Sequence, residues 1–82
     1  MQFRTNQVIS LADLPIGMSG VVVGMSDLLR GRKKVTDAGM VSGTEVSMLS
    51  HAPLGGLLKV RVLGSSFALH KDDGRSIMVR VM

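Results

Sequence analysis

The spacing of apolar residues changes in the middle of this chain, and the change limits the folds that it can adopt. Between residues 28 and 38, apolar or small residues recur every three or four positions, as on one face of a helix. After residue 45 they alternate with polar residues, which is typical of strands with one buried face. The segment that joins the two, DAGMVSGTEV (37–46), contains two glycines, which favour positive φ. We predict that Gly39 ends a short helix and that Gly43 turns the chain into a strand.

Five short strands are predicted, each bounded by turn residues. The second and third should pair as antiparallel neighbours, because Pro53, Gly55 and Gly56 between them supply a reversal. KDDGRS (71–76), before the last strand, is interpreted as a turn. The predicted strands are 20–25, 44–50, 58–63, 67–70 and 77–82. The side chains expected in the core are Met40, Val41, Val46, Met48, Leu58, Val60, Val62, Ile77, Val79 and Val81.

The number and length of these strands favour a closed sheet. A chain of 82 residues is too short for a large sandwich, and an open sheet would leave edges that favour aggregation. Closure into a small barrel answers both problems. The predicted fold is therefore mainly β, a small SH3-like β-barrel of about five strands with one short helix. We expect the barrel to span residues 10–82 and residues 1–9 to be an N-terminal extension, either flexible or an added edge strand.

Composition and motifs exclude several classes of function. The chain has no cysteine, which excludes a disulfide framework, thiolate metal ligands and a cysteine nucleophile. No paired-carboxylate constellation stands out, and neither a G-x-S-x-G nor a G-x-x-x-x-G-K-[ST] motif occurs. We predict that the protein is not an enzyme and has no catalytic residues and no cofactor. Because no apolar run reaches the length of a signal peptide or a membrane span, we expect a cytoplasmic protein without direct membrane insertion.

A basic cluster in the predicted helix is the strongest electrostatic feature of this chain, whose formal net charge is +4. The cluster consists of Arg30, Arg32, Lys33 and Lys34. Its functional interpretation is a docking surface for an acidic face of a partner protein, and the alternative is a solvated helix face. Nucleic acid is not the expected partner, because bases stack on aromatic side chains and this chain has few of them. It has no tryptophan or tyrosine, and its two phenylalanines are its only aromatic residues.

Leu54 is a second candidate contact residue. It stands between Pro53 and Gly55 in the HAPLGG turn, where a leucine at an exposed tip could touch a partner. The alternative is a turn residue folded back over the end of the barrel. Both interpretations stay open at this point.

The histidines and nearby carboxylates are a candidate metal site. His51 and His70, with Asp72 and Asp73 next to the latter, would suit Fe²⁺ or Zn²⁺ chemically. The two histidines, however, fall on different predicted elements, and no H-x-x-x-H or E-x-x-H spacing occurs. We therefore predict solvated histidines and no metal ligands.

Several blocks of the sequence resemble one family in the same order. They are SLADLPIGMSGVVVGM, DAGMVSGTEV, HAPLGGLLKVRV and GSSFALHKDDGRSIMV, which together cover about residues 10–81. This pattern is similar to that of the ferrous iron transport protein A (FeoA) family. The sequence departs from the family in the helix, GRKKVTDAG, and has His70 where arginine is common and Gly74 where alanine is common.

The resemblance implies a function that the residues alone do not. FeoA proteins are SH3-like barrels that act as cytoplasmic accessories of the bacterial ferrous iron transporter, a membrane protein with a cytosolic G-protein domain. We therefore expect a small regulatory subunit that contacts the cytosolic side of that transporter. The alternatives are a metal-responsive module related to the C-terminal domain of metal-dependent repressors and a small nucleic-acid-binding barrel. The direction of regulation and the oligomeric state stay open.

Overall fold

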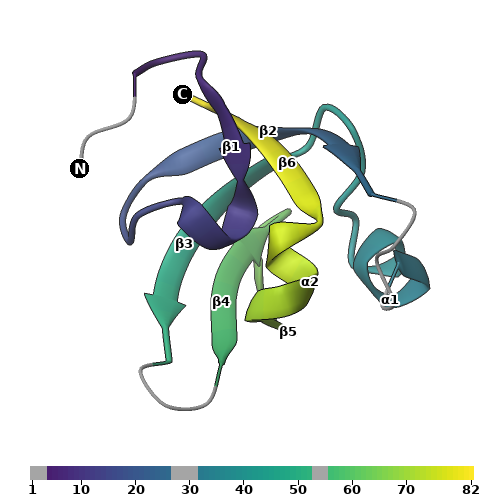
Figure 1. Cartoon of the computed structure of the whole chain (residues 1–82). Coiled ribbons are helices and arrows are strands. Elements are labelled where there is room, and N and C mark those ends of the chain that lie inside the picture. Colours follow the sequence, from purple (N-terminus) through teal and green to yellow (C-terminus); the bar gives the residue numbers. More distant parts are fainter. Residues whose placement is uncertain (1–3, 27–31, 53–55) are drawn as a thin grey trace.

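A computed structural model of the chain describes residues 4–26, 32–52 and 56–82, with Arg32 described through its backbone alone. Within these residues, six strands form one antiparallel sheet in the order β1-β6-β2-β3-β4-β5 (Figure 1). The strands are β1 (Val8–Ser10), β2 (Ser19–Met25), β3 (Glu45–His51), β4 (Leu57–Val62), β5 (Ser65–His70) and β6 (Ile77–Val81). The same residues include the 3-10 helix η1 (Leu11–Asp13) and the α-helices α1 (Arg32–Asp37) and α2 (Lys71–Arg75).

The sheet is bent into an SH3-like barrel. Its register shifts between Val22 and Gly24 in β2 and between Met48 and Ser50 in β3, and such bulges sharpen the bend and twist of a strand. As a result β1, β6 and β2 cross over the layer formed by β3, β4 and β5 (Figure 1). This confirms the predicted mainly β, SH3-like fold, with β1 pairing on β6 as a strand beyond the five that were predicted. The edges of the sheet are β1 and β5.

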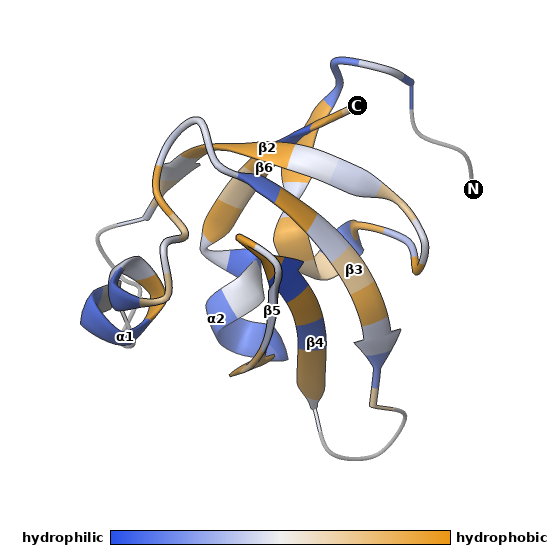
Figure 2. Ribbon diagram, turned by 180° about the vertical axis from the view of Figure 1, so that it is seen from behind, coloured by the Kyte–Doolittle hydropathy of each residue, from blue (hydrophilic) through white to orange (hydrophobic). Residues whose placement is uncertain are grey.

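The core is aliphatic and agrees with the predicted alternation. Figure 2 shows hydrophobic and hydrophilic residues alternating along β4, as expected for a strand with one face on the core. No polar or charged side chain is buried among the residues that the structure describes. The fully buried residues include Met40 and eight residues from strands, Val46, Met48, Leu58, Val60, Val62, Ile77, Val79 and Val81, all of which were expected there.

The prediction that Val41 also enters the core is wrong. Its side chain is 47% exposed, whereas that of Met40 is fully buried. The reason is a tight turn that begins at residue 41, in which the N–H of Thr44 donates to the carbonyl of Val41 (3.0 Å). Gly39 precedes this turn and Gly43 lies within it, with φ of 94° and 92°, and the N–H of Gly43 donates to the carbonyl of Val22 (2.7 Å). Both angles lie in the left-handed region that favours glycine.

The interpretation of KDDGRS as a turn is also wrong, because residues 71–75 form the helix α2. Acidic side chains in its first turn and Arg75 in its last turn suit the helix dipole, and Arg75 Nη1 lies 3.0 Å from Asp72 Oδ1. The decisive contact is tertiary, since the buried Gly74 packs against Leu58 and Ala12. A five-residue helix is too short to form without such packing.

The helix predicted before Gly39 is present as α1, which begins at Arg32 in the described part of the chain. The predicted first turns of that helix (27–31) lie outside the described residues, and so does Gly55. The helix ends through the bonds expected near a C-terminal glycine, with the N–H of Gly39 donating to the carbonyl of Thr36 (2.9 Å) and that of Met40 to the carbonyl of Val35 (3.2 Å).

Candidate protein-docking surfaces

The helix α1 presents two of the predicted basic residues to solvent. Lys33 and Lys34 are exposed, while Val35 between them and the end of the helix is 2% exposed and belongs to the core. Val35 therefore anchors the helix and fixes its two lysines on the outside. Arg32 begins α1, and its side chain is not described. Arg30 and Leu54 lie outside the described residues.

A groove of about 210 Å³ lies between α1 and the edge strand β5, and we call it the α1 groove. Figure 2 shows β5 between α1 and β4, so α1 lies on the side of β5 away from the rest of the sheet. The apolar residues that line the groove are Val35, Leu57, Phe67, Ala68 and Leu69, and the polar ones are Lys34, His70 and Asp73. A mostly apolar lining with a few charged groups resembles the composition of a small protein interface.

The structure separates most of the candidate metal ligands. His51 points to the loop before β2, where its Nε2 lies 3.1 Å from the carbonyl oxygen of Leu14. Asp72 pairs with Arg75 inside α2, which leaves His70 and Asp73 together in the α1 groove. Among the described residues, no group of three or more histidine, aspartate or glutamate side chains could hold a metal ion.

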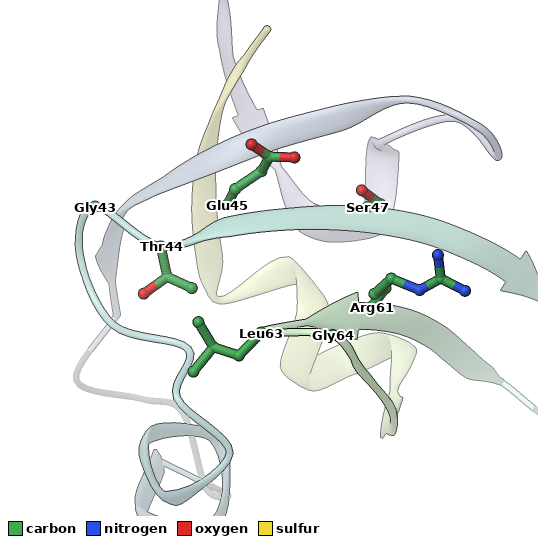
Figure 3. A pocket seen from close by; sticks show the side chains of 7 residues that line it. All are labelled: Gly43, Thr44, Glu45, Ser47, Arg61, Leu63 and Gly64. Carbon is green, nitrogen blue, oxygen red and sulfur yellow. The ribbon is translucent and has the colours of Figure 1, made fainter.

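A larger hollow of about 450 Å³ lies on the outer face of the sheet, where the turn before β3 approaches the turn after β4 (Figure 3). Its lining residues are Gly43, Thr44, Glu45, Ser47, Arg61, Leu63 and Gly64. Leu63 is 74% exposed, the largest value among the large hydrophobic residues of the described chain. None of these side chains was predicted to bind a partner.

Two cations continue this face along β4. Lys59 and Arg61 alternate with buried residues and are both exposed. Their cross-strand neighbours are small and neutral, Ala68 and Ser66 on β5 and Ser50 and Ser47 on β3. We call Lys59, Arg61 and Leu63 the β4 surface. The sequence alone did not indicate this surface, because Leu63 was expected at the end of the strand 58–63.

No helix in the described part of the chain is long and apolar enough to cross a bilayer. The α1 groove and the β4 surface are formed by the short helix α1 and by strands of the barrel.

Comparison with known proteins relates this fold to iron transport. A family model described as the FeoA domain matches residues 9–81. A FeoA-like protein from Clostridium acetobutylicum is 32% identical, with a TM-score of 0.81 and coverage of 93% of this chain and 88% of that one. The FeoA of Stenotrophomonas maltophilia, solved with zinc and described as an SH3 domain protein, is also 32% identical, with a TM-score of 0.73 over 87% of this chain and 88% of its own.

A second class of protein shares the fold alone. A manganese-dependent transcriptional repressor superposes with a TM-score of 0.83 over 99% of this chain at 18% identity, and the match covers 45% of the repressor. The comparison with curated protein sequences gives no match.

Proposed function

The chain belongs to the FeoA family, and on that premise we propose that it is a small cytoplasmic accessory subunit of a bacterial ferrous iron uptake system. It performs no chemistry of its own. It acts by binding the cytosolic side of the ferrous iron transporter, whose G-protein domain is the expected partner. The FeoA of Stenotrophomonas maltophilia has been put forward as a ferrous iron transport activating factor, which supports the same kind of role here.

One observation carries the proposed mode of action. Lys33 and Lys34 are exposed on a helix that Val35 anchors to the core, and this helix borders the apolar α1 groove. The lysines speed association with an acidic face, and the groove accepts an apolar side chain of the partner. Arg30, Arg32 and Leu54 belong to the same proposal as further partner contacts.

Regulation then requires a difference in affinity between two states of the transporter. A subunit that binds both states equally shifts neither, however tightly it binds. A tenfold preference for one nucleotide state corresponds to about 1.4 kcal/mol, which is within the usual range of coupling between sites. Binding to the transporter with and without guanine nucleotide is therefore the informative measurement.

The experiment is an interferometric titration of the full chain against the purified cytosolic domain and against the whole transporter in detergent. We expect saturable binding whose dissociation constant changes with guanine nucleotide. Lys33→Glu combined with Lys34→Glu should weaken it at least about tenfold at low salt. The matched control, Arg4→Glu with Arg80→Glu, makes the same charge change at exposed residues outside α1 and should bind as the wild type does.

Two results would contradict the proposal. Absence of binding in every nucleotide state removes the transporter as partner, and anaerobic calorimetry with Fe²⁺ then tests the metal-responsive alternative through His70→Ala. Equal loss of binding in the α1 variant and in its control would show that net charge, and not α1, determines the affinity.

A further inference from the structure

Leu63 occupies a backbone conformation that suits other residues better. Val62 pairs with Ser65, so Leu63 and Gly64 form a two-residue hairpin loop between β4 and β5. Both have positive φ, 52° for Leu63 and 81° for Gly64, as in a type I′ turn. Asparagine, aspartate or glycine is favoured at the first of these positions, and a leucine there is strained. The turn itself therefore gives no reason for a leucine.

Burial gives no reason either. Leu63 is 74% exposed, and its Cδ1 lies beside Gly39, where it would overlap a Cβ added to that glycine. This contact fixes the direction of the side chain without covering it. A strained residue whose side chain is oriented and exposed is a candidate for a functional contact.

The two cations of the β4 surface lie on the same face and are unpaired. The side chains of Lys59 and Arg61 take part in no hydrogen bond or ion pair within the described residues. Successive residues on one face of a strand are about 7 Å apart, so the two charges suit two carboxylates on an extended segment. The small serines and the alanine beside them leave this face open to a partner.

Figure 3 shows how Leu63 and Arg61 are placed. The two side chains extend in opposite directions along the hollow, and Glu45 points away from both. The hollow of about 450 Å³ that they border has room for several atoms of a partner's backbone and one large side chain.

We propose that the β4 surface is a second docking site, which binds an acidic protein segment that carries a large apolar side chain. Carboxylates of the segment pair with Lys59 and Arg61, and its apolar side chain packs on Leu63. A nucleic acid fits less well, because Leu63 offers no aromatic ring for base stacking. This site is separate from Lys33 and Lys34, and the inference holds whichever protein supplies the segment.

The test uses a model peptide, so that it does not depend on the transporter. The probe is the acetylated, amidated hexapeptide EDLFDE, titrated into the isotope-labelled full chain and followed by amide chemical shifts. Shifts should concentrate between Lys59 and Ser66. The peptide EDSSDE, with the same charge and no large apolar side chain, should bind at least about fivefold more weakly.

Variants of the chain separate the contributions. Leu63→Asn and the pair Lys59→Ser with Arg61→Ser should each weaken binding of EDLFDE about fivefold or more. Lys33→Ser with Lys34→Ser removes the same charge from α1 and should leave the dissociation constant within about twofold. Leu63→Asn should melt no lower than the wild type, because asparagine suits this turn, and Leu63→Gly serves as a second variant.

Several results would overturn the inference. They are shifts centred on α1 or spread over the whole surface, equal affinity for EDSSDE, and unchanged binding by Leu63→Asn and Leu63→Gly. Tighter binding of oligothymidylate, or of vesicles with anionic lipid, at the same residues would assign the surface to another class of ligand.

Discussion

The Cδ1 methyl of Leu63 overlaps the place where a Cβ on residue 39 would stand, so a larger residue at position 39 must turn the exposed Leu63 side chain aside. Gly39 also has a φ of 94°. We expect Gly39→Ala to lower the free energy of unfolding by about 1.5 kcal/mol, because the left-handed backbone costs about 1 kcal/mol and turning the Leu63 side chain from its rotamer adds about 0.5 kcal/mol. Urea unfolding followed by circular dichroism measures the loss.

Gly43 provides a matched control for that prediction. Its φ of 92° is nearly the same, and a Cβ there would meet nothing within 4 Å. Gly43→Ala should therefore cost the backbone contribution alone, about 1 kcal/mol. Equal losses for the two variants would contradict the steric role of Leu63. So would a Gly39→Ala loss that is the same in the Leu63→Gly background as in the wild type.

Leu63→Asn should make the isolated protein more stable. Asparagine tolerates the φ of 52° at this position, and little packing is lost because the leucine is mostly exposed. We expect the free energy of unfolding to rise by about 0.5 to 1 kcal/mol, which raises the Tm of a domain of this size by a few degrees. Differential scanning calorimetry measures it, and a lower Tm would contradict the assignment of strain to this turn.

The strands could be predicted because their pattern is local. Each buried face repeats every second residue, and β4 and β6 keep this alternation throughout their length. Gly39 and Gly43 were identifiable for a similar reason, since positive φ selects glycine without reference to the rest of the fold.

The features that the sequence did not reveal depend on contacts between distant residues. The helix α2 forms where Gly74 meets Leu58 and Ala12, and its five residues carry no helical periodicity of their own. Leu63 was assigned to the end of a strand, and its place in the hairpin loop follows only from the pairing of Val62 with Ser65. The β4 surface was missed for the same reason, because unpaired cations are recognised only once their neighbours are known.

His51 should contribute to stability although it is partly exposed. Its Nε2 lies 3.1 Å from the carbonyl oxygen of Leu14, a bond that joins the end of β3 to the loop before β2. His51→Ala should lower the free energy of unfolding by about 1 kcal/mol, the usual net value of one hydrogen bond. His70→Ala, at an exposed position, should change it by less than about 0.5 kcal/mol. Chemical denaturation compares the two, and equal effects would remove the structural role of the bond.

A smaller residue at position 58 should partly compensate the loss of stability caused by a larger residue at position 74. A Cβ on Gly74 would stand 2.6 Å from Leu58 Cδ1, and Leu58 is buried, so Gly74→Ala alone overpacks the core. The overpacking outweighs the gain in helix propensity of about 1 kcal/mol, and we expect a net loss of about 1 kcal/mol.

Leu58→Val alone removes a methylene and should cost about 1 kcal/mol. The double variant should lose less than the sum of the two by at least about 0.5 kcal/mol, which a double-mutant cycle in urea measures. Additive losses would mean that α2 shifts away from β4 to admit the new methyl group.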